Sequence, residues 1–268
     1  MCAMTIRTGA AAAVGTTLGA LGALGGLGAG PVPAADAASN GTSAQAEYTA
    51  AIKAVGKKGV HFSSTALQNG VHLTVVGDTG STSGAQTLVV KNGNTTEHMN
   101  AVVVGSTGYV TGNAAALHHV IGLTSGQSSK YAGKWLSFPA SNTSLGELVS
   151  GLLNSQVATE LQMSGPFSYG KPTTLQGQHV LTIHGNVATE NGNKVPVVLY
   201  VPATGTPLPS EEVTNPGSAG GSTAIHGTVS FTNWGENVTQ KAPAHAVSLL
   251  KLVPASDGGS STTAPAGG

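Results

Sequence analysis

The side chains in this sequence that could most readily do chemistry are its nine histidines. His118 and His119 are adjacent, so on a helix their side chains point about 100° apart and are poorly placed to share a metal ion. His179 and His184 are five residues apart in a strand-like run, which places them on opposite faces. No His-Glu-x-x-His motif and no carboxylate–histidine arrangement is present. The spacings favour hydrogen-bonded or solvated histidines and predict no metal site.

Nucleophilic and acidic side chains are no better arranged for catalysis. The Gly-Ser pairs at 80–81 and 105–106 fall in turns between strands, and Ser128 and Lys130 are too close for a Ser-x-x-Lys motif. Glu211 and Glu212 follow Pro209 in an expected loop, where adjacent carboxylates are normally solvated. A nucleophile, a base and an oxyanion donor are never found together. We therefore expect no enzyme and no cofactor; a hydrolase whose site is assembled from distant residues is the weaker alternative.

Composition restricts the partners. The chain has 268 residues, of which 8% are charged, and 11 basic side chains balance 11 acidic ones. Binding to nucleic acid or to an anionic membrane surface needs a basic excess, so neither partner is expected. Cys2 is the only cysteine, which excludes an intrachain disulfide framework.

The two ends of the chain read differently from its middle. Residues 1–38 carry Arg7, a small-residue apolar run and Ala-Asp-Ala at 35–37, as a signal peptide does. The alternative is an Ala/Gly-rich leader of a cytosolic protein. No Cys follows the apolar run, so no lipoprotein anchor is expected, and the predicted location is extracytoplasmic, secreted or associated with the cell envelope. Residues 39–45 read as a linker, 46–255 as one domain and 256–268 as a disordered tail. Translation could start at Met1 or Met4, which affects only the leader.

Hydrophobic periodicity divides the domain into strands, helices and further strands. A helix is expected from Tyr48 to Gly56 and another from Ala114 to Ile121, capped by Asn113. Apolar residues at i, i+3, i+4, i+7 and i+8 from Leu145 predict a third helix, capped by Thr143 or Ser144. Period-two runs separated by Gly and Asn turns predict antiparallel strands at 60–67, 71–78, 85–93, 97–105, 108–112, 179–189, 194–204 and 223–234.

Strands with an apolar face and helices with an apolar stripe can pack into a filled core or enclose a cavity. Composition does not separate the two, because an acyl-chain cavity is lined by the same residue types. The large side chains that would shape such a cavity are Trp135, Phe138, Phe167, Phe231 and Trp234.

Five stretches resemble, in the same order, the actinobacterial LppX/LprG-type exported (lipo)proteins, which have the LolA half-barrel fold. They are GVHFSSTA (59–66), GSTGYVTGNAAALHHVIG (105–122), AGKWLSFPASN (132–142), VVLYVPATGTPLP (197–209) and FTNWGENVTQKAP (231–243). The resemblance implies an α+β fold: a strongly curved antiparallel β half-barrel with helices packed on its concave face. It also implies binding or shuttling of acylated lipids without catalysis. In this reading 223–234 is the last strand, and Pro243 begins a helical segment whose Val247, Leu249 and Leu250 pack on the rim.

The sequence departs from the family's lipoproteins in lacking the Cys after the signal segment. We expect a monomeric, non-catalytic exported protein that holds an acyl chain or another apolar lipid ligand. The alternative is an envelope module with a filled core that binds another protein. The expected ligand-binding residues are Phe62, Leu73, Val75, Val104, Leu148, Leu152, Leu199 and Phe231.

Overall fold

A computed structural model describes residues 4–6, 14–16, 42–142, 145–188, 193–215 and 226–252 of the chain. Its main element is one sheet of thirteen strands. The first half of the sheet is built by β3 (Val60–Gln68), β4 (Val71–Thr79), β5 (Ser83–Asn92), β6 (Thr95–Val104), β7 (Thr107–Gly112) and β8 (Leu136–Pro139). The second half contains β9 (Ser164–Tyr169), β10 (Thr173–Leu175), β11 (Gln178–Ala188), β12 (Lys194–Pro202), β13 (Glu211–Thr214) and β14 (His226–Thr232).

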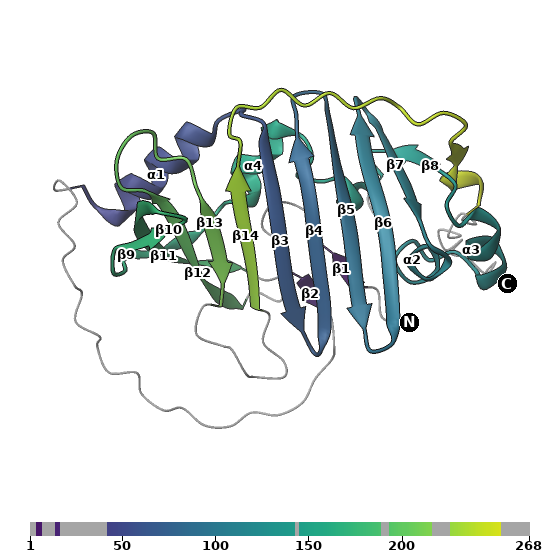
Figure 1. Cartoon of the computed structure of the whole chain (residues 1–268), viewed down its shortest axis with the longest axis horizontal. Coiled ribbons are helices and arrows are strands. Elements are labelled where there is room, and N and C mark those ends of the chain that lie inside the picture. The colour runs from purple at the N-terminus through teal and green to yellow at the C-terminus, as the bar shows by residue number, and fades with distance from the viewer. Residues whose placement is uncertain are drawn as a thin grey trace, which may run out of the picture.

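The two halves meet where β14 pairs with β3, so the last long strand lies beside the first (Figure 1). The spatial order is β10-β11-β12-β13-β14-β3-β4-β5-β6-β7-β8-β15, and β9 pairs with β11 off this path. All neighbours are antiparallel except β15 (Val247–Ser248), which lies parallel to β8. The expected α+β architecture with a large curved antiparallel sheet is confirmed.

Glycine and asparagine turns fix the register of the long hairpins. Asn69 and Gly70, between β3 and β4, have φ of +50° and +77°, as the primed hairpin turns require. Gly93, between β5 and β6, has a φ of +54°. Both links are the turns that the sequence predicts.

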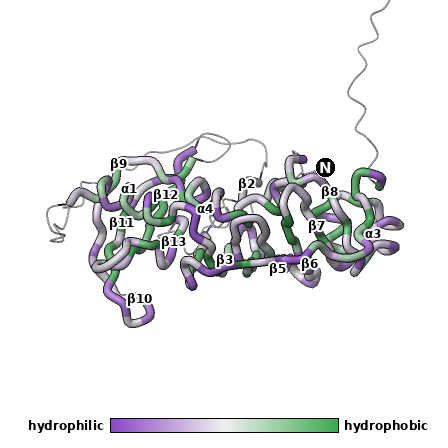
Figure 2. The backbone as a smooth tube through the Cα atoms, turned by 90° about the horizontal axis from the view of Figure 1, so that it is seen from above, coloured by the Kyte–Doolittle hydropathy of each residue, from purple (hydrophilic) through white to green (hydrophobic). Residues whose placement is uncertain are grey.

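Helices cover the face toward which both ends of the sheet bend (Figure 2). The first, α1 (Ala44–Val55), starts after Ser43, whose Oγ accepts the Ala46 N–H at 3.2 Å, and stops at Gly56. It buries the stripe Ala44, Tyr48, Ala51 and Val55. The helix begins two residues before the predicted start of the domain at 46, so the end of the predicted linker is helical.

Two further helices lie near the β6–β8 end of the sheet (Figure 1). The predicted cap of α2 (Ala114–His119) is confirmed: Asn113 Oδ1 accepts the Ala116 N–H at 2.9 Å. Helix α3 (Ser125–Tyr131) was not predicted; it begins with a capping box formed by Thr124 and Gln127.

The continuous helix predicted from Leu145 to Leu153 is wrong. This stretch forms the 3₁₀ turn η1 (Gly146–Leu148) and further turns, and α4 (Asn154–Glu160) begins only afterwards. Gly151 at φ +76° interrupts any helix, and main-chain hydrogen bonds between 152–154 and Gly80 hold the chain extended there. The proposed caps Thr143 and Ser144 lie outside the described residues.

The helical segment predicted after Pro243 is also wrong. The chain from 236 to 246 contains no helix and runs along one end of the strands (Figure 1). β15 then adds to the free edge of β8, where the Val247 N–H donates to Trp135 O at 2.9 Å. An exposed strand edge offers unpaired main-chain groups, and pairing with them outweighs helix formation in a short segment. The final turn η2 (Leu249–Lys251) buries Leu249 completely, while Leu250 stays 51% exposed.

A separate two-stranded sheet joins β1 (Met4–Ile6) and β2 (Val14–Thr16), both within the predicted signal peptide. The remainder of that segment and the predicted tail at 256–268 lie outside the described residues. Among the described helices, none combines the length and the apolar character that spanning a membrane requires.

Candidate functional site

The inner face of the sheet is a set of buried rows that run across the strands. Cross-strand partners share a face, so the registers define these rows directly. The central row is Ile183, Leu199, Glu212, Val229, Ser64, Val75, Leu88 and Met99, and each of these is buried. Apart from two polar residues, the row is hydrocarbon from β11 to β6.

Of the eight residues expected to contact a ligand, five lie on this inner face of the sheet. Phe62, Leu73, Val75, Leu199 and Phe231 are at most 4% exposed, and Phe62 pairs directly with Phe231. Their role as ligand contacts remains a prediction.

Val104 does not belong to this face. Along β6 the buried inner residues are Met99, Ala101 and Val103, and strand alternation puts Val104 on the opposite face, where it is only partly buried. The inner position at this level of the sheet is therefore Val103, which pairs with Gly84.

The layer opposite the inner face is the segment 145–163, which we call the cover. Its buried apolar residues include Leu148 and Leu152, the other two predicted contacts, together with Leu145, Val149, Val157, Leu161 and Met163. The apolar residues predicted to be buried are therefore buried, although they do not lie on one continuous helix.

The cover is tied to the sheet at a few polar points near one end of β4 and β5. Gly80 donates its N–H to Leu152 O at 3.3 Å, and its own carbonyl accepts the Asn154 N–H at 2.8 Å. Gln86 Nε2 donates to Leu148 O at 2.9 Å. Glycine permits this approach: a Cβ on Gly84 would lie 2.1 Å from Leu152 O.

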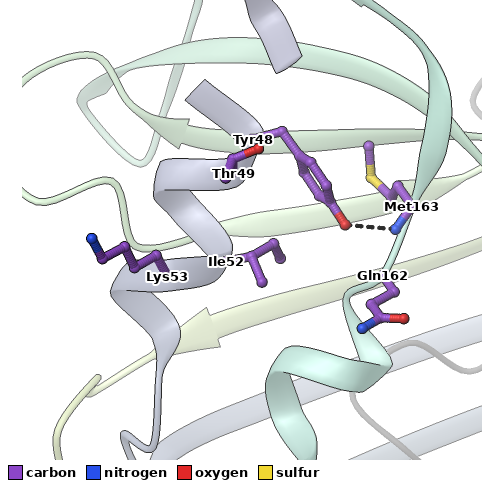
Figure 3. A pocket seen from close by; sticks show the side chains of 6 residues that line it. All are labelled: Tyr48, Thr49, Ile52, Lys53, Gln162 and Met163. Carbon is purple, nitrogen blue, oxygen red and sulfur yellow. Dashed lines mark hydrogen bonds between the residues drawn. The ribbon is translucent and has the colours of Figure 1, made fainter. Parts of the chain in front are cut away.

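Tyr48 of α1 joins the other end of the cover. Its hydroxyl accepts the Met163 N–H at 2.7 Å and donates to Leu161 O at 3.2 Å, and its ring stacks on Phe167 with centroids 4.7 Å apart. Figure 3 shows the ring reaching from α1 to the chain that leaves α4. A pocket of about 410 Å³ lies here, lined by Tyr48, Thr49, Ile52, Lys53, Gln162 and Met163.

Tyr48→Phe should lower the free energy of unfolding by roughly 1–3 kcal/mol, because the buried Met163 N–H loses its acceptor. Tyr169→Phe is the matched control, since the Tyr169 hydroxyl makes one exposed bond, to Thr42 O at 3.1 Å. Urea unfolding followed by circular dichroism measures both. Equal losses in the two variants would contradict a special role for the Tyr48 contacts.

The prediction that Glu212 is a solvated loop residue is wrong. Glu211–Thr214 is a strand, not a loop, and Glu212 is 1% exposed on the inner face rather than solvated. Neither of its carboxyl oxygens has a hydrogen-bond partner among the described residues. Burial, with a smaller contribution from the charge of Glu160, raises the pKa of Glu212 to about 8.

Two histidine–carboxylate pairs also appear that the sequence analysis did not find. His61 Nδ1 lies 2.6 Å from Asp78 Oδ1, and His119 Nδ1 lies 2.6 Å from Glu97 Oε1. Strand register brings the first pair together, since His61 and Asp78 are direct cross-strand partners. No group of three His, Cys, Asp or Glu residues within the described ranges is arranged to hold a metal ion.

Several solved structures are similar to this chain. LprF from Mycobacterium bovis is 16% identical, with 75% of this chain and 96% of that one covered and a TM-score of 0.49. The lipoprotein LppX from Mycobacterium tuberculosis is 14% identical, with 73% and 97% covered and a TM-score of 0.44. A LolA superfamily protein from Nitrosomonas europaea is 7% identical, with 74% and 96% covered and a TM-score of 0.31.

These structures include proteins of the LppX and LolA type that the sequence motifs resemble. No protein-family model matches the sequence, and no curated protein matches it.

Proposed function

We propose that this chain is a non-catalytic, exported binding protein that holds an acyl chain or another apolar ligand between the inner face of the sheet and the cover. It acts as a monomer outside the cytoplasm. The single observation that carries the proposal is that the sheet and the cover bury apolar side chains in one shared cluster.

That contact is mostly hydrocarbon on both sides, and Ser64 and Glu212 are the two polar residues in the central row of the sheet. Leu148 and Leu152 belong to the same buried apolar cluster as Val75 and Leu88. Hydrogen bonds join the cover to the sheet at Gly80 and Gln86, and Tyr48 of α1 binds the other end of the cover. The cover consists of short turns, interrupted by Gly151, and the seven-residue helix α4, and such short elements depend on packing against their neighbours for stability.

An acyl chain can replace apolar contacts in such a contact at little net loss. Each methylene group that enters leaves water with a gain of about 0.8 kcal/mol. The displaced leucines exchange one hydrocarbon surface for another, and the hydrogen bonds at Gly80, Gln86 and Tyr48 keep the cover attached at its margins.

Leu152→Asp should abolish uptake of an acyl ligand, because it places a carboxylate at a fully buried position between the two layers. Leu67→Asp is the control: Leu67 lies on the outer face of β3 and is 41% exposed, so this variant should bind like the wild type. Ligand occupancy is read by native mass spectrometry, and circular dichroism checks the fold. A folded Leu152→Asp variant that keeps its ligand would contradict the proposed position.

The proposal itself is tested on protein purified from its own envelope fraction, with native mass spectrometry followed by solvent extraction. A co-purifying acyl lipid at close to one per chain supports it, and the mass identifies the ligand class. A ligand-free mass that persists after exposure to lipid vesicles would favour an envelope module that binds another protein.

A further inference from the structure

We propose that Glu212 is the polar recognition residue of this ligand site: its carboxylic acid donates a hydrogen bond to an uncharged oxygen of the ligand, such as an ester or alcohol oxygen. It thereby selects such ligands over acyl anions, and ionisation of Glu212 releases them. This inference rests on the proposed function and adds the residue that gives it specificity.

The position of Glu212 argues for a role beyond packing. In the central row its cross-strand neighbours are Leu199 and Val229, both at most 5% exposed. An apolar side chain would fill this place at no polar cost. Burying a carboxyl group here costs free energy, since the group leaves water and gains no hydrogen bond from the described residues.

Other acidic side chains of the sheet are compensated. Glu97 lies on the same inner face and is paired with His119. Glu211, the preceding residue, projects to the outer face and accepts a hydrogen bond from Ser230 Oγ at 3.2 Å. Glu212 thus differs from Glu97 and Glu211, and both of its carboxyl oxygens lack a partner among the described residues, whereas Glu236, in the loop after β14, has one such oxygen. Buried polar groups without partners are typical of functional positions.

Two titratable groups on the helices over the inner face interact with Glu212, namely Glu160 and Tyr48, and both are acids. Glu160 at the end of α4 raises the pKa of Glu212 in addition to the effect of burial. Tyr48 of α1 has its own pKa raised, mainly by burial and in smaller part by the charge of Glu212. The Tyr48 hydroxyl is already engaged with the main chain at Leu161 and Met163.

This environment defines what Glu212 can recognise. At neutral pH it is predominantly an uncharged acid with one O–H to donate. An ester or alcohol oxygen accepts this hydrogen bond without bringing charge into the site. A fatty-acid carboxylate would bring a second negative charge close to Glu160 in a buried region, which is unfavourable.

The test is a competition between monoolein and oleate, which share one acyl chain and differ at the polar end. Both are offered to the full chain at pH 7 in nonionic detergent, and native mass spectrometry reads the bound fraction of each. Wild type should prefer monoolein. Glu212→Leu should lose about tenfold in monoolein affinity, the effect of one buried hydrogen bond, without losing oleate. Glu212→Gln, which keeps a donor, should retain the preference.

A second experiment measures monoolein binding as a function of pH. Monoolein binding by the wild type should fall as the pH rises past 8, and binding by Glu212→Gln should stay level. Loss of the same size in Glu212→Gln would overturn the inference, as would an unchanged preference in Glu212→Leu. Both of those results leave the proposed function standing, whereas a wild type that takes up neither ligand overturns the proposed function as well. Glu212→Leu should stay folded because it removes an unpaired polar group at nearly constant volume.

Discussion

Between pH 5 and pH 8 the wild-type chain should lose stability, and Glu212→Gln should remove most of that loss. The folded state holds the Glu212 proton up to about pH 8, while the unfolded chain releases it near the ordinary value of 4.5. In this window the folded state binds the extra proton, so the free energy of unfolding falls as pH rises. The slope reaches about 1.4 kcal/mol per pH unit and ends above pH 8.

Other groups titrate in the same range, so the informative quantity is the difference between the two proteins. Burial lowers the pKa of His184, which adds a stability that rises with pH below about 6.5. Burial and the neighbouring Asp78 raise the pKa of Glu236, which acts in the same direction as Glu212. Both contributions cancel when the curve of Glu212→Gln is subtracted from that of the wild type.

Urea unfolding by circular dichroism at each pH from 5 to 9 gives the two curves. Glu211→Gln is the control, because its side chain lies on the outer face of the same strand beside Ser230 and should leave the wild-type slope in place. Parallel curves for wild type and Glu212→Gln would mean that Glu212 is not held as a buried acid.

The fold could be predicted from the sequence because its signals are local. Alternation within a strand, an Asn-Gly turn and an Asn cap each act over a few residues, and β3, β4 and α2 follow them closely. The resemblance of five stretches to the LppX/LprG type added the curvature of the sheet, which no single stretch encodes.

The candidate site could be predicted only in part, because its character depends on register. Phe62 and Leu199 were identifiable as inner residues from alternation alone. Glu212 was not, since four residues of β13 after a proline look like a polar loop until β12 and β14 enclose them. The pairing of His61 with Asp78 is likewise a product of the β3–β4 register.

The cover was misread for a different reason. The leucines from Leu145 to Leu153 have helical spacing, but their positions are set by the sheet they face. Main-chain bonds from Gly80 and the close approach at Gly84 determine the backbone, and the leucines then fill the space that remains.

Gly84→Ala should therefore be among the most damaging single-methyl changes in this protein, with an expected loss of about 2–4 kcal/mol in the free energy of unfolding. The added Cβ would lie 2.1 Å from Leu152 O and 2.9 Å from Asp78 O, and both are main-chain atoms. Relief requires the cover to move away from β5, which breaks the bonds that join Gly80 to Leu152 and Asn154. Chemical denaturation measures the loss.

Gly126→Ala is the matched control, because the same glycine-to-alanine change should there raise stability instead of lowering it. Gly126 lies in α3 with nothing within 4 Å of an added Cβ, so alanine should stabilise the helix by roughly 0.5–1 kcal/mol.

Amide hydrogen exchange shows which part of the structure Gly84→Ala destabilises. The Asn154 amide, which donates to Gly80 O, should exchange faster in that variant and at the wild-type rate in Gly126→Ala. Unchanged protection at Asn154 would show that the cover is not anchored at Gly80 and Gly84. Faster exchange there, together with faster release of a bound acyl ligand, would identify the cover as the part of the molecule that opens.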